Sequence, residues 1–227
     1  MFLKKRSYEP EIIDDFSIDD ERIDKALSEL NIINSFLGGY SVTKKGLNEF
    51  RKMVPSNGKI KILDVGAGGS DLFILRQNGF ALKPVSLDKN IRAAKFLKRK
   101  DPRLDIVCAD AFNLPFKPKS FDVVHASLFL HHFKEKSIGR IFEELRKISI
   151  DDIIVNDLRR SYVAYLGISI LTGIFSKSKL IKNDGPLSVK RSFKRSDLKN
   201  IFNNHEFSFV IIKRNWAFRW LIYAKFN

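Results

Sequence analysis

Apolar and polar residues alternate along the central part of the chain in a pattern that predicts strands and helices in succession. Five short apolar runs are typical of buried parallel strands, at residues 61–65, 83–87, 105–108, 121–126 and 152–155. Segments with apolar residues three and four positions apart follow most of them, at 72–78, 91–100 and 136–149. The succession predicts an α/β fold with a doubly wound parallel sheet covered by helices on both faces.

The flanks of this core carry different patterns. Acidic residues at 19–21 predict the start of a helix that ends at Gly38-Gly39, and a second helix is expected at about 42–53. After the fifth strand, residues 158–195 contain an uncharged stretch and a turn-like segment at 183–186. A last helix at 196–203 then precedes two β-like runs, 207–213 and 216–225, which predict a hairpin that adds an antiparallel strand to the sheet edge.

These patterns predict one domain over residues 1–227. It comprises a helical cap at 1–58, a core at 59–157, a segment at 158–195 that would cover a substrate, and the last helix and hairpin at 196–227. The lone Cys108 excludes a disulfide framework and favours a reducing, cytoplasmic setting. The uncharged stretch at 161–176 is shorter than a membrane-spanning helix requires.

The net charge of +15 raises nucleic acid as a partner, because a basic surface attracts phosphate. However, acidic residues gather in 9–31, and a general lysine bias would raise the charge without any RNA contact. We therefore favour a solvated basic surface over a polyanion site.

The most informative segment is 59–71, KIKILDVGAGGSD, an apolar run that glycines stop abruptly. Such glycines let the backbone turn sharply and let a ligand approach main-chain N–H groups. A nicotinamide dinucleotide site would place a third glycine at Asp71, where a carboxylate would repel pyrophosphate. The Gly-Lys-Ser/Thr of a nucleotide triphosphate loop is also missing. A ligand that is positively charged and lacks phosphate fits better, and S-adenosylmethionine is such a ligand.

Four segments in order, DVGAGGSD, SLDKN, CADAFNLPF and SFDVVHASLFLHHF, resemble the motifs of class I S-adenosylmethionine-dependent methyltransferases over about 59–157. Within that superfamily they are similar to the small-molecule group that includes ubiquinone and menaquinone C-methyltransferases. The resemblance implies a Rossmann-like sheet of seven strands with the last strand antiparallel. Ser70 departs from the common glycine spacing, where a small residue should be tolerated.

The resemblance also implies which residues bind the cofactor. Asp64 would support the turn or hold the cofactor's ammonium group, and Asp88 would accept hydrogen bonds from both ribose hydroxyls. The full implied set is Asp64, Gly66, Gly68, Asp88, Lys89, Asp110, Ala111 and Ser127. Within it, Asp110 and the Ala111 backbone would bind adenine. Asp71 is expected to cap a helix. Phe112 would either stack on adenine or belong to the core.

His131 and His132 follow the fourth strand at the rim where open α/β sheets bind ligands, so they are the candidates for a general base. One of the pair could instead only pack beneath the site, and methyl transfer needs alignment more than a strong base. His125 and His205 are not candidates. No metal is expected, since two histidines without a nearby carboxylate or cysteine make a poor metal site.

The acceptor side leaves three alternatives open for 161–182: a lid over a hydrophobic substrate, a helix packed on the core, or a peripheral membrane contact with Lys177, Lys179 and Lys182 facing anionic lipid. The expected lid residues are Tyr162, Tyr165, Leu166, Ile170, Leu171, Ile174 and Phe175. Segments that resemble uncharacterised bacterial methyltransferases place Asn156, Arg159, Arg160 and Ser188 at the substrate.

The function that follows is methyl transfer from S-adenosylmethionine to an oxygen or carbon of a small phenolic, quinone-like or lipophilic acceptor. The rival hypotheses are an RNA methyltransferase, suggested by the charge, and a non-catalytic protein that binds the cofactor.

Overall fold

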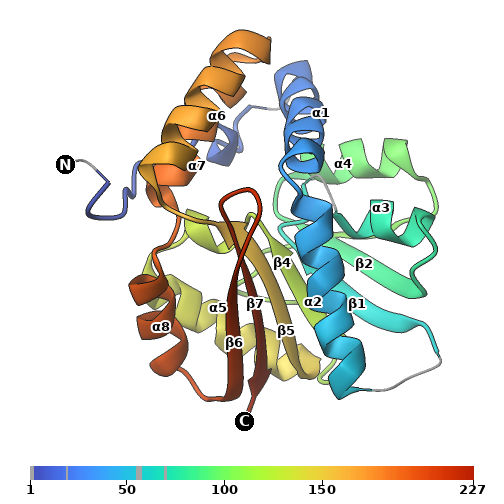
Figure 1. The fold of residues 1–227 in the computed structure, drawn as a ribbon. Coiled ribbons are helices and arrows are strands. Elements are labelled where there is room, and N and C mark those ends of the chain that lie inside the picture. The colour runs from blue at the N-terminus through green and yellow to red at the C-terminus, as the bar shows by residue number, and fades with distance from the viewer. Residues whose placement is uncertain (1–2, 19, 55–57, 69–70) are drawn as a thin grey trace.

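Seven strands form one sheet in the order β3-β2-β1-β4-β5-β7-β6 in the computed structural model, which describes residues 3–18, 20–54, 58–68 and 71–227 (Figure 1). The first five strands run parallel, and β7 is antiparallel to both of its neighbours. The strand bounds are β1 Ile60–Val65, β2 Leu82–Asp88, β3 Asp105–Cys108, β4 Phe121–Ser127, β5 Ser149–Leu158, β6 Phe207–Asn215 and β7 Arg219–Phe226. The predicted Rossmann-like sheet with an antiparallel last strand is confirmed.

The apolar runs become central strands because both of their faces are buried. Leu63 on β1 and Val124 on β4 pack into the layer that also contains Phe142 and Leu198, from the helices on one face. Their neighbours Ile62 and Val123 pack with Leu47, Phe50 and Leu72 from the helices on the other face. Successive residues of a strand therefore fill two different layers, which explains why the strands are almost continuously apolar.

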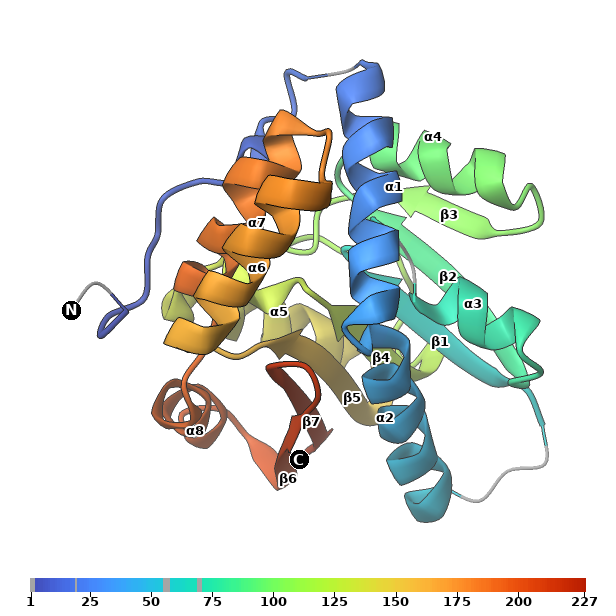
Figure 2. The same ribbon diagram turned by 45° about the horizontal axis from the view of Figure 1, so that its top comes forward.

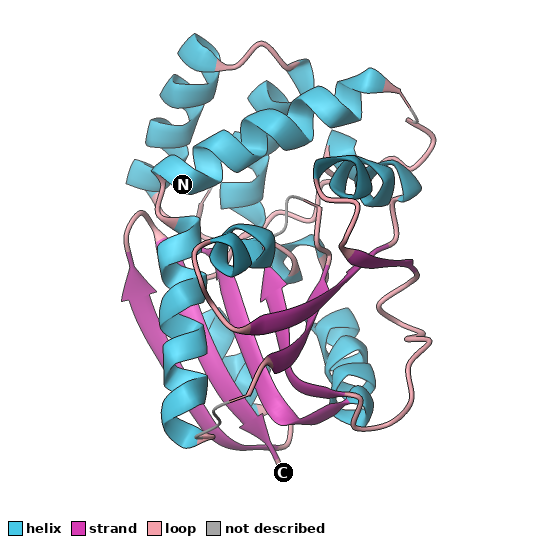
Figure 3. Cartoon of the chain, turned by 90° about the vertical axis from the view of Figure 1, so that its right-hand side faces the viewer, coloured by secondary structure: helices cyan, strands magenta, loops and turns pink. Residues whose placement is uncertain are grey.

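Helices cover both faces of the sheet and gather beyond the carboxyl ends of its parallel strands (Figure 3). Asp20 caps α1 by accepting a hydrogen bond from the Arg22 N–H, as the acidic start predicted. The bounds are α1 Glu21–Phe36, α2 Gly39–Met53, α3 Asp71–Gln77, α4 Ile91–Lys100, α5 Glu135–Ile148, α6 Tyr162–Phe175, α7 Lys179–Arg191 and α8 Arg195–Asn203, with short 3₁₀ helices η1 Ile12–Asp14 and η2 Leu130–His132.

Two predicted features differ in the structure. The segment 183–186 is not a turn but the interior of α7, Pro186 included. Tertiary contacts outweigh its turn propensity, because Asp184 is buried and its carboxylate accepts the N–H groups of Ile12 and Ile13 at 2.9 Å each. The hairpin does join the sheet at its edge, but β7 inserts beside β5 and leaves β6 outermost.

Some predictions fall outside the described residues. Those on Asp19, on the 55–57 linker and on Gly69 and Ser70 belong to this group, and so does the capping role expected for the Asp71 side chain. Within the part of the chain that is described, no helix combines the length and apolar content that crossing a membrane requires.

Candidate active site

A cavity of about 650 Å³ lies at the carboxyl ends of the central strands, between the sheet and the helices α1, α6 and α7. All ten residues that the sequence singled out line this one cavity. They are Asp64, Gly66, Gly68, Asp88, Lys89, Asp110, Ala111, Ser127, His131 and His132. The fold brings them together because the carboxyl ends of parallel strands meet at one edge of the sheet.

The turn after β1 needs glycine at Gly66 for two reasons. Its φ of +66° lies in the left-handed region, and a Cβ at this position would come within 2.2 Å of the Phe129 ring. At Gly68, the N–H donates a 2.8 Å hydrogen bond to the Asp88 carboxylate, which ties the turn to the end of β2. The turn is therefore held in one shape, with Phe129 packed against one side of it.

Asp88 uses both carboxylate oxygens on backbone groups, since its Oδ1 also accepts the Asn90 N–H at 2.8 Å. Burial raises the pKa of Asp88, and the two N–H groups offset this effect only in part. A largely desolvated carboxylate gains from further hydrogen-bond donors, and the ribose hydroxyls predicted to bind here are such donors. The residues around β2 thus fit a nucleoside.

Lys89 and Asp110 bind each other across the carboxyl ends of β2 and β3, with Nζ and Oδ2 2.8 Å apart. Burial would raise the pKa of Asp110, but the Lys89 hydrogen bond and the Phe112 N–H hold the pKa below its usual value. Lys89 therefore keeps the Asp110 carboxylate in its charged form. Phe112 lines the cavity and makes an edge contact with Phe133, so it belongs both to the cavity wall and to the aromatic packing behind it.

Asp64 is turned toward a buried histidine instead of standing alone at the turn. Its Oδ1 lies 2.7 Å from His125 Nδ1, and His125 Nε2 lies 3.1 Å from the Thr43 hydroxyl. Asn156 donates to that hydroxyl at 3.0 Å and accepts from Arg219 at 3.1 Å. Arg219 in turn donates to Asn34 on α1. This buried polar chain, Asp64–His125–Thr43–Asn156–Arg219–Asn34, begins and ends at the cavity wall.

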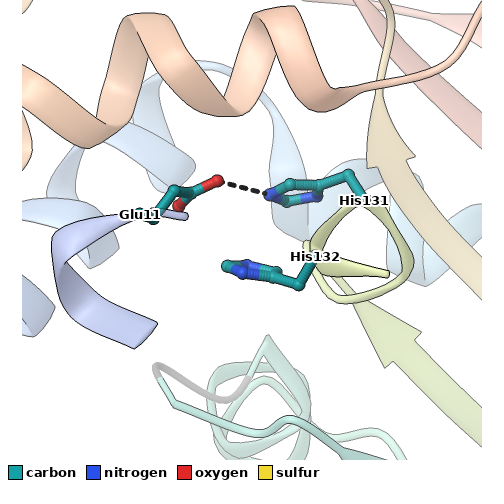
Figure 4. Close-up of side chains that lie close together, drawn as sticks. All are labelled: Glu11, His131 and His132. Atoms are coloured by element: carbon teal, nitrogen blue, oxygen red, sulfur yellow. Dashed lines mark ion pairs between the residues drawn. The ribbon is translucent and has the colours of Figure 1, made fainter. Parts of the chain in front are cut away.

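His131 is enclosed by carboxylates on both sides of its ring. Nδ1 lies 2.7 Å from the Asp157 carboxylate, and Nε2 lies 3.5 Å from Glu11 Oε1 (Figure 4). Burial would lower the pKa of His131, but the two carboxylates outweigh it and raise the pKa to about 9. The ring is therefore an imidazolium at neutral pH. This revises its predicted role, because a general base must be unprotonated.

The His132 ring lies beside that of His131, with centroids 4.4 Å apart and planes tilted by 33°, and His132 lines the cavity. Its Nδ1 lies 2.8 Å from Asp14 Oδ1, but the angle between the two groups is too bent for a regular hydrogen bond. Arg191 fixes the backbone beneath both rings by donating to the carbonyl oxygens of His131 and His132. With Nδ1 directed at Asp14, Nε2 is the nitrogen left for a substrate proton, so His132 is the better candidate base.

Glu11, His131 and His132 each bring a potential metal-ligand atom to within 4.8 Å of the others. The sequence argument against a metal was therefore wrong in its premise, because the fold supplies nearby carboxylates. Positive charge already surrounds Glu11, whose Oε1 lies 3.6 Å from Arg191 Nε. Burial would raise the pKa of Glu11, but His132 and His131 hold the pKa below its usual value. We therefore interpret Glu11, His131 and His132 as a group that binds protons and not a metal ion. The absence of a metal stays a prediction.

The His131 environment predicts a pH-dependent stability. The folded pKa of about 9 lies above the ordinary value of 6.5, so the stabilisation is complete below about pH 6.5 and lost as the pH rises through 9. The expected decrease in unfolding free energy is of the order of 3 kcal/mol. Urea unfolding at pH 6.5, 7.5, 8.5 and 9.5 measures it. His131→Gln should remove most of the decrease, and a wild-type profile flat across this window would contradict the protonated ring.

The rest of the cavity wall is mainly apolar and comes from the cap, α6, α7 and the tip of the β6–β7 hairpin. Its apolar members include Ile13, Leu27, Leu30, Ile33, Leu37, Ile168, Leu171, Ile181, Val189 and Phe218. Of the residues predicted to border a substrate, Ser188 lines this part. Asn156 belongs to the buried polar chain, Arg160 is bound to Ser192 and Asp197, and Arg159 lies over the Phe218 ring. Of the expected lid residues, Leu171 faces the cavity.

Several site residues were missed from the sequence. Glu11 and Asp14 lie in the N-terminal part of the predicted cap, and Arg191 lies in the segment expected to cover a substrate. Glu11 and Asp14 reach the histidines across more than a hundred residues of sequence, and Arg191 reaches His131 across 60. Asp157, which lies in β5, was not among the candidates either. Nothing in the local pattern around them signals the contact.

Comparison with known proteins finds a family match in the core. Residues 63–152 match the family model described as "Methyltransferase domain". This part of the chain is therefore similar to that family. S-adenosylmethionine is the cofactor of this domain family, so the predicted cofactor is confirmed, while the ubiquinone-type subgroup is not. No curated protein matches the chain.

Solved structures resemble this chain in fold. A SAM-dependent methyltransferase from Aquifex aeolicus shares 14% identity at a TM-score of 0.60 and covers 97% of this chain and 100% of its own. The plantazolicin methyltransferase BpumL in complex with SAH shares 14% identity at a TM-score of 0.63, covering 95% of this chain and 99% of its own. Magnesium protoporphyrin IX methyltransferase from Synechocystis PCC 6803 with bound SAM shares 14% identity at a TM-score of 0.54. The match covers 84% of this chain and 80% of the methyltransferase.

Proposed function

We propose that this protein transfers a methyl group from S-adenosylmethionine to an oxygen of a small, lipophilic acceptor of phenolic or quinone-like character. The observation that carries the proposal is the division of one cavity into a polar half at the strand ends and an apolar half under the cap and α6. His132 lines the same cavity and would lie where a nucleophile meets the methyl group.

The polar half fits the cofactor. The fixed turn at Gly66 and Gly68 would lie along its amino-acid portion, Asp88 would accept the ribose hydroxyls, and Asp110 with the Ala111 backbone would bind adenine. S-adenosylmethionine supplies an electrophilic methyl carbon on a positively charged sulfur. The carboxylates in this half would favour that charge.

The chain's own groups would position and deprotonate the acceptor. His132, with Nδ1 directed at Asp14, would take the hydroxyl proton on Nε2 as the oxygen attacks the methyl carbon. His131, held as an imidazolium between Asp157 and Glu11, would limit the movement of the adjacent His132 ring. The apolar wall would exclude water, so that the acceptor, methyl carbon and sulfur can align.

The named acceptors of two structural neighbours, plantazolicin and magnesium protoporphyrin IX, support a small-molecule acceptor for this architecture. Their low identity leaves the acceptor class of this chain to be argued from its cavity. The apolar residues of α1, α6 and α7 favour a molecule with a large hydrophobic part.

The test is incubation of the purified protein with isotopically labelled methyl donor and extracts of lipophilic metabolites, read by mass spectrometry. We expect the label in an organic-soluble product as a methyl ether, with S-adenosylhomocysteine formed in equal amount. Label in RNA would support the rival RNA methyltransferase that the charge of +15 suggests. Cofactor binding without any transfer would support a non-catalytic binding protein.

A further inference from the structure

The outward face of α6 is built from large aliphatic side chains that nothing in the described chain covers. Four of them are spaced by three and four residues and so share one face of the helix. Their exposed fractions are 65% for Val163, 57% for Leu166, 61% for Ile170 and 69% for Ile174. Figure 2 shows α6 in front of α7, on the outside of the molecule. The inward face lines the cavity with Ala164, Gly167, Ile168, Leu171 and Thr172.

An ordinary surface helix turns its apolar face inward and a polar face outward, whereas α6 is apolar on both faces. α6 has no charged residue over its 14 positions. The alternative that it packs as a core helix does not describe it, because only Ala164 and Thr172 are buried. A contiguous exposed apolar face of this kind is typical of a surface that binds a membrane or another protein.

The apolar surface continues across the mouth of the cavity. The tip of the β6–β7 hairpin presents Trp216 with 76% of its surface exposed, and the end of α1 presents Phe36 with 81% exposed. The two elements are joined there, since the Ala217 N–H donates to the Leu37 carbonyl at 2.9 Å. Trp216, Leu37 and the inward face of α6 all line the cavity, so its mouth lies among these exposed groups.

Positive charges flank this surface. Lys177 is exposed in the connection after α6, and Lys179 is exposed at the first position of α7. At the other end of α6, Arg159 lies over the Phe218 ring, and burial together with the charge of nearby Arg214 lowers its pKa. Among the described residues, no carboxylate forms an ion pair with the side chains of these four cations, although Glu29 accepts a hydrogen bond from the Lys177 backbone N–H at 3.0 Å. Cationic side chains without carboxylate partners beside an apolar face are suited to anionic lipid headgroups.

We propose that α6 and the hairpin tip form a surface that binds an anionic membrane, with α6 lying in the plane of the headgroups. A helix of 14 residues is too short to span a bilayer, which takes about 20. A second copy of the chain fits less well, because a two-fold contact through α6 would bring the same cations together. The mouth of the cavity would then face the lipid phase. This last step rests on the proposed lipophilic acceptor.

The chain contains its own probe for the test. It has two tryptophans, of which Trp216 is exposed and Trp220 is buried with 1% exposed. We expect a blue shift of tryptophan emission when vesicles of phosphatidylcholine with 30% phosphatidylglycerol are added, and little shift with phosphatidylcholine alone. Trp216→Phe should abolish the shift. Flotation of the wild-type protein with the anionic vesicles should show binding that decreases with added salt.

Matched variants separate this surface from general hydrophobicity. The double change Leu166→Ser and Ile170→Ser should weaken flotation by at least about tenfold, from the loss of buried apolar area. The control Ile150→Ser and Phe209→Ser removes exposed apolar groups outside α6 and should bind like the wild type. Calorimetry should give the same S-adenosylmethionine affinity for both doubles, which verifies folding.

Absence of binding to anionic vesicles, or equal losses in the two doubles, would overturn the proposal. So would a concentration-dependent dimer in analytical ultracentrifugation that the α6 double abolishes, because the second copy would then be the occupant. None of these readouts needs the acceptor, so failure to find methyl transfer would leave the membrane proposal standing, and the reverse also holds.

Discussion

Replacement of Asp88 by asparagine should weaken S-adenosylmethionine binding by about 100-fold or more. The Asp88 carboxylate is largely desolvated and is already oriented by the N–H groups of Gly68 and Asn90. Hydrogen bonds from two ribose hydroxyls to a charged acceptor contribute about 1.5–3 kcal/mol each, and an amide replaces one acceptor oxygen by a donor. Isothermal titration calorimetry with the purified variant measures the change.

Asp122→Asn is the matched control for this experiment. Asp122 also accepts a backbone N–H, from Lys61 at 2.7 Å, but it lies at the amino end of β4, away from the cavity. The control should bind the cofactor like the wild type, and both variants should unfold cooperatively. Equal affinity of Asp88→Asn and wild type would refute the ribose assignment.

Replacement of His132 by glutamine should lower kcat by about 10²–10³-fold, the usual contribution of a positioned general base. Cofactor affinity should hardly change, because His132 lies on the acceptor side of the site. The rate of the variant should also rise with pH, since an acceptor hydroxyl that ionises in solution no longer needs the base. Steady-state rates with the acceptor found by the labelling experiment, measured across a pH series, give both results.

The control here is His205→Gln, which changes a histidine packed against Gly139 and distant from the cavity wall. It should retain the wild-type rate and pH profile. A His132→Gln enzyme with an unchanged kcat would show that methyl transfer proceeds by alignment alone. His131→Gln should instead act through stability, as its buried imidazolium implies.

The sheet could be predicted because its signal is local. Strands such as 61–65 and 121–126 are buried on both faces and are therefore almost entirely apolar, so each can be recognised from its own residues. The meeting of Asp64, Asp88 and Asp110 at one cavity followed from the same fact, since they lie just before, at or just after the carboxyl ends of parallel strands. Their role in binding the cofactor stays a prediction, and their contacts with neighbours, such as Lys89 with Asp110, could not be read from the local pattern.

The acceptor half could not be predicted in the same way. Glu11 and Asp14 come from a segment with no regular pattern, and they reach the histidines only because Arg191 and Asp184 hold that segment against α7. The turn expected at 183–186 failed for the same reason, as a buried carboxylate paired with distant N–H groups keeps the segment helical. Contacts between remote parts of the chain decide this half of the site.

The buried polar chain from Asp64 to Asn34 connects two parts of the cavity wall through hydrogen bonds. Each internal member gives or accepts a hydrogen bond on either side of itself, and disrupting one such buried bond costs about 1–3 kcal/mol. Asp64, at one end of this chain, lies in the part of the cavity proposed for the methyl donor, and Asn34, at the other end, lies on α1 among the apolar residues proposed for the acceptor. A change at either proposed subsite could therefore be transmitted to the other through buried hydrogen bonds.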